Sequence, residues 1–270
     1  MKWDINNTLE AYEKLNNTKV PYIVVGGQAV NLWIEYFTKH KFIDKSEWEH
    51  LAPLISKDLD LLNSGAEAKL IAERLGVKIE TYAHSSRQIS PNSGTLFIPT
   101  SNGELMVHCL FRTTGTDPKE IIGTAKNYED SGVVIPLMHP LLCLEGKIQC
   151  YFTHPQETRQ DLKHVKLSIL ALRAIIQDHV QKDEAEPTRS VLDRLLKLFQ
   201  SKHYDELCKV GVDLVDAIPI KILEESNNPK LKGFALNEFP RLKKKLDERK
   251  ALVLPISENT VKTEKNIDNL

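Results

Sequence analysis

The chain has 270 residues, of which 41% are hydrophobic and 27% are charged. This is the composition of a globular protein, and it excludes a mostly disordered or fibrous chain. The 36 Lys and Arg residues balance the 37 Asp and Glu residues, for a formal net charge of -1, so no overall positive field draws the protein to nucleic acid or to an anionic membrane. Any such contact has to come from a local patch.

Helix and strand patterns alternate through the first half of the chain. The patterns predict helices over 8–15, 28–37, 46–51 and 66–75, and strands over 22–25, 57–62, 77–81, 95–98 and 104–111. From residue 137 onward only helical spacing recurs, with helices expected over 139–151, 157–181 and 187–199 and in shorter pieces up to about residue 249. We therefore expect an α+β domain over residues 1–136, a helical domain over 137–255, and a disordered tail over 256–270.

The cysteines and the apolar runs bear on the compartment. Four cysteines form no CxxC pair, which favours free thiols over a zinc site or a disulfide framework. No apolar run has the length of a signal peptide core or a membrane span. These patterns predict a cytoplasmic protein with no membrane partner.

The most informative feature is a strand that runs into Gly26-Gly27 and a helix, followed by Asp58-Leu59-Asp60 in the next strand. A double glycine lets backbone amides approach a phosphate closely, and the following helix offers free N–H groups and a positive dipole end. Asp58 and Asp60 stand two apart on a strand, so both carboxylates project from one face, where hard oxygen ligands can hold Mg²⁺. A tight turn and a solvated strand face are the alternative interpretations.

Two of these segments resemble a known family. VVGGQAVN at 24–31 and SKDLDLL at 56–62 resemble the GG and DxD motifs of the DNA polymerase β-like nucleotidyltransferase superfamily. Within that superfamily, the abortive-infection type nucleotidyltransferase toxins are the nearest match. The spacing between the two motifs is longer than in minimal enzymes, which implies an insertion in residues 38–55. The resemblance implies a nucleotidyltransferase-fold mixed sheet with flanking helices, followed by a helical domain.

The resemblance also implies a reaction, in which a nucleoside monophosphate moves from an NTP to a hydroxyl and pyrophosphate leaves. Gly26, Gly27 and Gln28 would hold the triphosphate, while Asp58 and Asp60 would bind two Mg²⁺ ions that clamp the attacking and leaving oxygens.

The stretch 139–147 is similar to the first helical segment after the sheet in these proteins. On this resemblance Lys147, and Arg159 with Asp161, would line the nucleotide cleft, where the cations counter the triphosphate charge. A solvated lysine and a surface ion pair are the alternatives.

One position departs from the family pattern. The family places a third carboxylate on a later strand, and the matching position in 104–110 is His108. A neutral imidazole favours softer metals than Mg²⁺. His108 could instead serve as general base for the acceptor hydroxyl, because its ordinary pKa lies near neutral pH. Glu104 could replace the missing acid only with a shifted register, and the remaining interpretation is a site that binds nucleotides without turning them over.

We therefore expect a Mg²⁺-dependent nucleotidyltransferase whose acceptor is an RNA such as tRNA, a protein or a small molecule. A toxin that pairs with an antitoxin is one form of this enzyme. The run of basic residues over 241–250 is the densest positive patch in the sequence and a candidate RNA contact. The alternative is a catalytically degenerate nucleotide-binding or interaction module that keeps the fold but has His108 in place of the third carboxylate.

Overall fold

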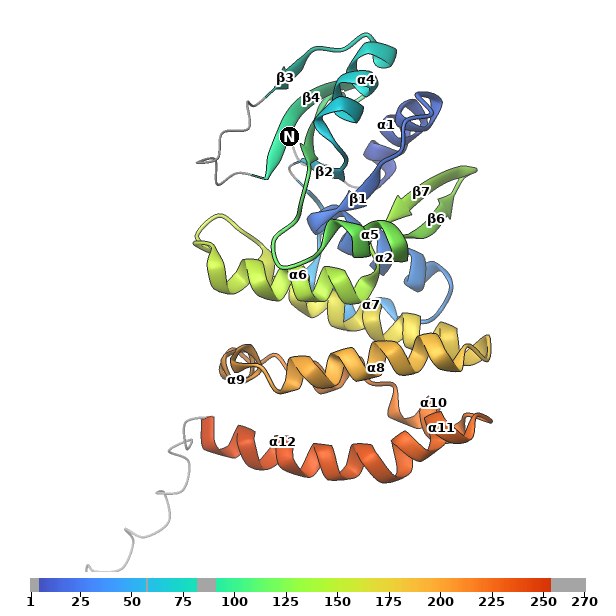
Figure 1. Cartoon of the computed structure of the whole chain (residues 1–270), viewed down its shortest axis with the longest axis vertical. Helices are drawn as coiled ribbons and strands as arrows, with labels where there is room; N and C mark the ends of the chain where they lie inside the picture. The colour runs from blue at the N-terminus through green and yellow to red at the C-terminus, as the bar shows by residue number, and fades with distance from the viewer. Residues whose placement is uncertain (1–4, 57, 82–90, 254–270) are drawn as a thin grey trace, which may run out of the picture.

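The computed structural model describes residues 5–56, 58–81 and 91–253, and its sheet holds seven strands within these ranges (Figure 1). The strands lie in the order β3-β4-β5-β2-β1-β7-β6. Their bounds are β1 Ile23–Val25, β2 Leu59–Leu62, β3 Ile79–Thr81, β4 Asn92–Thr100, β5 Gly103–Leu110, β6 Lys126–Asp130 and β7 Val133–Leu137. The pairs β1–β7 and β2–β5 are parallel and the other four are antiparallel. The protein is therefore of the α+β class with a mixed sheet.

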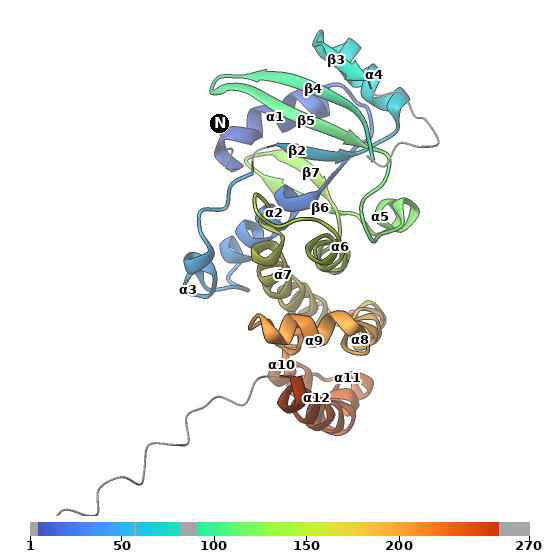
Figure 2. The ribbon, with the colours of Figure 1, turned by 90° about the vertical axis from the view of Figure 1, so that its left-hand side faces the viewer.

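Helices cover both faces of this sheet. Two of them, α1 (Ile5–Asn17) and α4 (Gly65–Leu75), pack on β4 and lie on the side away from α2 (Gly26–Lys39), as Figure 2 shows. Helix α2 packs on β1 and β2, and most of its residues are buried, including Trp33 and Phe37. Two short helices, α3 (Lys45–Trp48) and the 3₁₀ helix η1 (Glu49–Leu51), lie in the connection from α2 to β2.

After β7 every described element is helical. The bounds are α6 Pro140–Thr153, α7 Asp161–Gln181, α8 Ala185–Phe199, α9 Lys202–Lys209, η2 Leu214–Ala217, α10 Ile220–Glu225, α11 Pro229–Gly233, the π-helical turn η3 Phe234–Glu238 and α12 Phe239–Val253. Helices α6 and α7 pack on each other and on α2, and the later helices stack below them in Figure 1. The long helix α7 thus connects the sheet and the helical region through one continuous core.

Several elements differ from the sequence-based expectations. Helix α5 (Pro118–Thr124) and strand β6 were not expected, although Asp117 caps α5 and Pro118 opens it. Strand β6 carries polar and charged residues at four of five positions, so it has no apolar alternation to reveal it. The tail predicted over 256–270 lies outside the described residues. No helix in the described part of the chain has the length and apolar character to cross a bilayer.

Candidate functional site

Strand pairing brings the two sequence motifs together. In the antiparallel pair β1–β2, Asp60 lies opposite Val25, the last residue before the glycine turn. In the parallel pair β2–β5, the same Asp60 lies beside His108. Paired residues of neighbouring strands have their Cβ atoms about 5 Å apart. The sheet register alone therefore places Asp60 between the glycine turn and His108.

Gly26 and Asp60 are in direct contact. Gly26 has a φ of +70°, and a Cβ built on it would lie 2.4 Å from the Oδ2 atom of Asp60. A side chain at position 26 would meet both a left-handed backbone conformation and this carboxylate. Glycine is required here on both counts, and it lets the carboxylate lie against the backbone at the start of α2.

The next two residues of the turn behave differently. A Cβ on Gly27 would lie 2.6 Å from the Cε1 atom of His164, a buried residue of α7, so this glycine faces α7. Gln28 is only 2% exposed and lies in the protein interior. No side chain caps the first turn of α2, whose N-cap residue is Val25, so the first backbone N–H groups of this helix are available to an anion.

Asp58 lies just before β2 and contacts His108. The Nε2 atom of His108 is 3.4 Å from Oδ2 of Asp58. The Nδ1 atom of the same ring is 3.0 Å from the Asn92 amide nitrogen and 3.0 Å from the Thr95 hydroxyl. The hydrogen bond with Asp58 raises the pKa of His108 above its ordinary value. Asp58, Asp60 and His108 therefore form one cluster at the centre of the sheet.

Asp60 lies in an environment that disfavours its negative charge. Burial, followed by the nearby charge of Asp58, raises its pKa to about 6, while His108, Lys147 and Arg159 act in the opposite direction. Two carboxylates near each other in a poorly solvated place favour a bound cation, because the cation offsets both burial and mutual repulsion.

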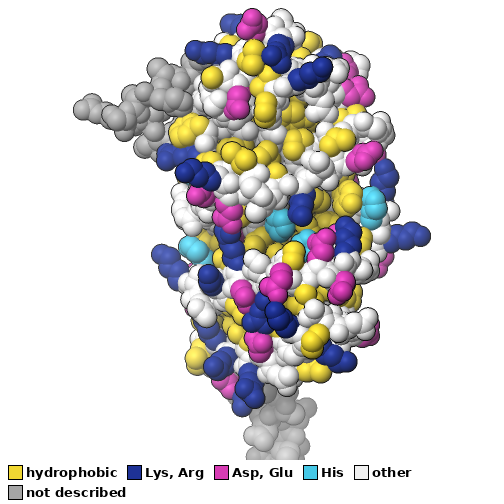
Figure 3. All heavy atoms as spheres, turned by 45° about the vertical axis from the view of Figure 1, so that its right-hand side comes forward, with side chains coloured by type: hydrophobic (Ala, Val, Ile, Leu, Met, Phe, Trp, Pro, Cys, Tyr) yellow, Lys and Arg dark blue, Asp and Glu magenta, His cyan; other side chains and the backbone are white. Residues whose placement is uncertain are grey.

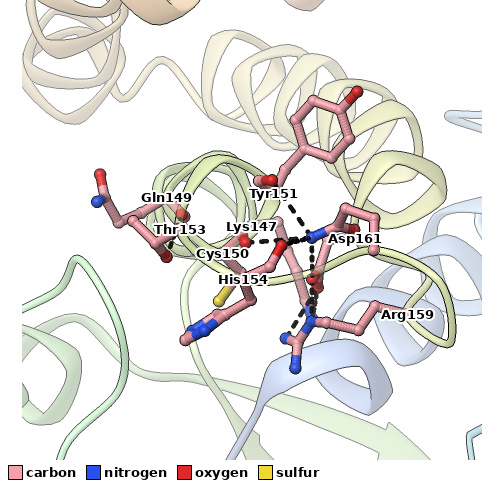
Figure 4. Close-up of polar contacts among 9 residues, drawn as sticks. Lys147, Gln149, Cys150, Tyr151, Thr153, His154, Arg159 and Asp161 are labelled. Atoms are coloured by element: carbon pink, nitrogen blue, oxygen red, sulfur yellow. Dashed lines mark hydrogen bonds and ion pairs between the residues drawn. The ribbon is translucent and has the colours of Figure 1, made fainter.

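Two cations, Lys147 on α6 and Arg159 in the loop before α7, meet Asp161 at the start of α7 (Figure 4). Asp161 is 2% exposed and accepts a hydrogen bond from Nζ of Lys147 at 2.9 Å and further bonds from the Arg159 guanidinium. Burial would raise the pKa of Asp161, but Arg159 and Lys147 outweigh it and lower that pKa to about 2. Asp161 is thus an ionised residue that holds both cations in place.

One cavity of about 530 Å³ joins the two clusters. Its lining includes Gly26 and Asp60 on one side and Lys147 and Arg159 on the other. The size lies in the range of small-molecule sites. Five other predicted site residues are not among those that line this cavity: Gly27, Gln28, Asp58, His108 and Asp161.

The sequence did not single out other lining residues, notably Arg112 and His154. For His154 a partial signal existed, since Cys143, Lys147 and Cys150 recur at the spacing of one face of α6, His154 follows at the same spacing as its C-cap residue, and all four line the cavity. For Arg112 there was none, because it follows β5 in an irregular segment over 111–117.

Asp58 and Asp60 are the two carboxylates that the site offers to the expected Mg²⁺. Within the described residues, no group of three or more His, Cys, Asp or Glu side chains has an arrangement that could hold a metal ion. Two carboxylates, with substrate phosphates and water completing the shell, are nevertheless a usual way for proteins to bind Mg²⁺. Asp58 and Asp60 could supply the two protein ligands of such a site.

The basic run on α12 is partly neutralised. Lys243 pairs with Asp247, Arg249 with Asp205, and Lys250 with Asp213. On the side of the molecule that Figure 3 shows, basic and acidic side chains are interspersed over the helical region. The three exposed cations that remain are Arg241, Lys244 and Lys245.

Comparison with known proteins gives little at the level of sequence. No family model matches the chain, and no curated protein matches it. Among solved structures, the chain is similar to JHP933 from Helicobacter pylori, with a TM-score of 0.33 and 14% sequence identity over 92% of this chain and 97% of that one.

Proposed function

We propose that this protein is a Mg²⁺-dependent nucleotidyltransferase with the fold of the DNA polymerase β-like superfamily. One observation carries the proposal: Gly26 and Asp60 line the same cavity as Lys147 and Arg159. A carboxylate beside an uncapped helix N-terminus, facing two cations, suits a substrate that carries several phosphates and a metal ion. The cavity volume of about 530 Å³ has room for such a ligand.

Each residue then has a physical role. Bound Mg²⁺ would supply charge neutralisation at the reacting phosphoryl group. Asp58 and Asp60 hold it, and the first N–H groups of α2 bind phosphate oxygens at the glycine turn. Lys147 and Arg159 stabilise the charge that develops on the leaving pyrophosphate, because positioned cations in a poorly solvated cavity need little reorganisation.

His108 acts on Asp58 in this proposal. Its Nε2 atom faces Asp58, and its Nδ1 atom faces the Asn92 amide and the Thr95 hydroxyl. With both nitrogens engaged, the ring fixes the orientation of the Asp58 carboxylate. The acceptor hydroxyl belongs to an RNA, a protein or a small molecule, and a role as the toxin of a toxin–antitoxin pair is part of the proposal.

Labelled NTPs test the catalytic claim. Wild-type protein is incubated with each α-labelled NTP, Mg²⁺ and a mixture of total RNA and protein, beside the variants Asp58→Asn and Asp60→Asn. We expect each variant to lose at least about a hundredfold in labelling, the cost of removing one well-placed electrostatic group. Asp247→Asn, a change in an exposed ion pair on α12, is the matched control and should label like wild type. Equal labelling by all four proteins would remove the catalytic claim.

Cys150 offers a separate test of binding. It lines the cavity and is half-buried, whereas Cys109, Cys143 and Cys208 are buried. A thiol reagent should therefore label Cys150 first, and saturating Mg²⁺ and NTP should slow that labelling. Cys150→Ser, which removes the reactive thiol, shows whether the signal comes from this position. Labelling that no NTP slows would contradict a nucleotide site in this cavity.

A second candidate is a nucleotide-binding module without turnover. It is favoured by the position of His108, which lies beside Asp60 on β5 where the superfamily resemblance expects a carboxylate. The variant His108→Asp separates the two. Transfer activity gained by the variant over a silent wild type supports the module, and an active wild type that the change leaves unaffected removes it.

A further inference from the structure

His164 is a buried histidine whose ring makes no hydrogen bond with any described residue. It is 8% exposed, and neither ring nitrogen has a partner among the described residues. Its ring lies against the glycine turn, because a Cβ on Gly27 would fall 2.6 Å from Cε1 and 3.0 Å from Nε2. A buried polar side chain with no partner is uncommon and requires an explanation.

Burial, helped by the nearby cations, keeps this ring neutral. Burial is the main cause that lowers the pKa of His164 to about 3, with Lys147, Lys163 and Arg159 acting in the same direction and Asp161 against them. Lys147 comes from α6, Arg159 from the loop before α7, and the other two from α7 itself. Three cations therefore face one anion around His164.

Both cavity-lining cations of this group are engaged with Asp161. Lys147 and Arg159 bond the two Asp161 oxygens while they also line the cavity. A polyphosphate in the cavity would add several negative charges next to them and compete with Asp161 for their N–H groups. It would offset the cations that act on His164, and it would leave Asp161, three residues earlier on the same helix, short of donors.

Resting on the function proposed above, we propose that polyphosphate binding in this cavity is coupled to the uptake of one proton by His164, which then donates to Asp161. The proton comes from solvent, and no other bond forms or breaks. His164 is a positioning residue: once charged and paired, it fixes α7 against Gly27 and holds the glycine turn in its phosphate-binding position. Binding of polyphosphate then strengthens as the pH falls from 8 towards 6, by up to about tenfold per pH unit for one linked proton.

Calorimetry on the full chain measures the linked proton. Tripolyphosphate without added metal is titrated at pH 7 in two buffers of different ionisation enthalpy, so that the difference in heat gives the protons taken up. Wild type is compared with His164→Asn and with His179→Asn. His179 is a matched control, since it is a buried histidine near the other end of the same helix, where its ring lies beside His139. Protons lost or gained by the phosphates themselves are common to all three proteins and cancel.

We expect wild type and His179→Asn to take up the same number of protons, and His164→Asn to take up fewer by up to one. The same proton count in all three proteins would overturn the proposal, and so would the absence of tripolyphosphate binding. If His164→Asn fails to fold, the ¹³C shift of the His164 Cε1 atom in wild type decides: protonation on addition of tripolyphosphate supports the proposal, and an unchanged shift overturns it. NTP labelling would still report on the enzyme, so either failure is distinguishable from failure of the proposed function.

Discussion

The contact between Gly27 and His164 predicts that Gly27→Ala destabilises the wild-type protein but stabilises a variant that lacks the His164 ring. In Gly27→Ala the new methyl group would lie 2.6 Å from Cε1, 3.0 Å from Nε2 and 3.3 Å from Nδ1 of a ring that is buried. Overpacking of this kind costs about 1 to 3 kcal/mol. Replacing a helical glycine by alanine returns up to about 1 kcal/mol, and Gly27 has no positive φ to oppose that gain. We expect a net loss of about 1 to 2 kcal/mol in the free energy of unfolding.

The same substitution should be favourable once the ring is gone. In a His164→Ala background the three atoms nearest to the new methyl group are gone, so Gly27→Ala should stabilise the protein by up to about 1 kcal/mol. Equilibrium urea denaturation at pH 7.5, followed by circular dichroism, gives the four free energies of this cycle. Gly123→Ala on α5, where a Cβ meets nothing within 4 Å, should have the same effect in both backgrounds. If Gly27→Ala changes the free energy of unfolding equally with and without the His164 ring, the packing of α7 on the glycine turn is contradicted.

Three further outcomes are expected. Burial lowers the pKa of His139 from 6.5 to about 3. Between these two pH values the unfolded chain binds a proton and the folded protein does not, so the free energy of unfolding should fall by up to about 1.4 kcal/mol per pH unit as the pH drops. His139→Asn should reduce this pH dependence, as measured by urea titrations at several pH values. Arg194→Met removes the cation that pairs with the mostly buried Glu145 and with the partly exposed Glu120. It should cost about 1 to 3 kcal/mol in the free energy of unfolding, because a buried carboxylate loses its partner. Arg189→Met in an exposed pair should cost less than about 1 kcal/mol. Urea unfolding compares the two variants, and equal costs would contradict the burial of Glu145. Gly26→Ala forces alanine to a φ of +70° and displaces Asp60, so it should abolish NTP labelling. Backbone strain of about 1 to 2 kcal/mol and overpacking of about 1 to 3 kcal/mol should both lower its free energy of unfolding, and circular dichroism checks that the variant is folded. Labelling retained by the folded variant would show that Asp60 need not touch the turn.

Local sequence signals located most of the elements around the site. The β-branched run before Gly26 and the helical spacing after it predicted β1 and α2, and both are present. Ser64 and Gly76 delimit α4 through a capping box and a left-handed C-cap. These signals lie within one element and its ends, so a single sequence reveals them.

The same local signals do not predict which residues far apart in the sequence come into contact. Asp58 and Asp60 were expected to act together from one strand face, and their joint role as metal ligands stays a prediction. The local pattern did not reveal that Asp60 lines the cavity or that Asp58 contacts His108. Arg112 reaches the cavity only because the segment after β5 folds over α6, and His164 meets Gly27 only because α7 packs on α2. Neither position has a local pattern that differs from an ordinary loop arginine or core histidine.

The antiparallel pairing of β1 and β2 means that the chain leaves the centre of the sheet at Val25 and returns to it at Asp60, directly opposite. The connecting segment between them, which holds α2, α3 and η1, therefore has both of its ends at the same point of the sheet. Its outer turn at residues 39–41 is exposed, so we expect a change in length there to leave the pairing of Val25 with Asp60 in place.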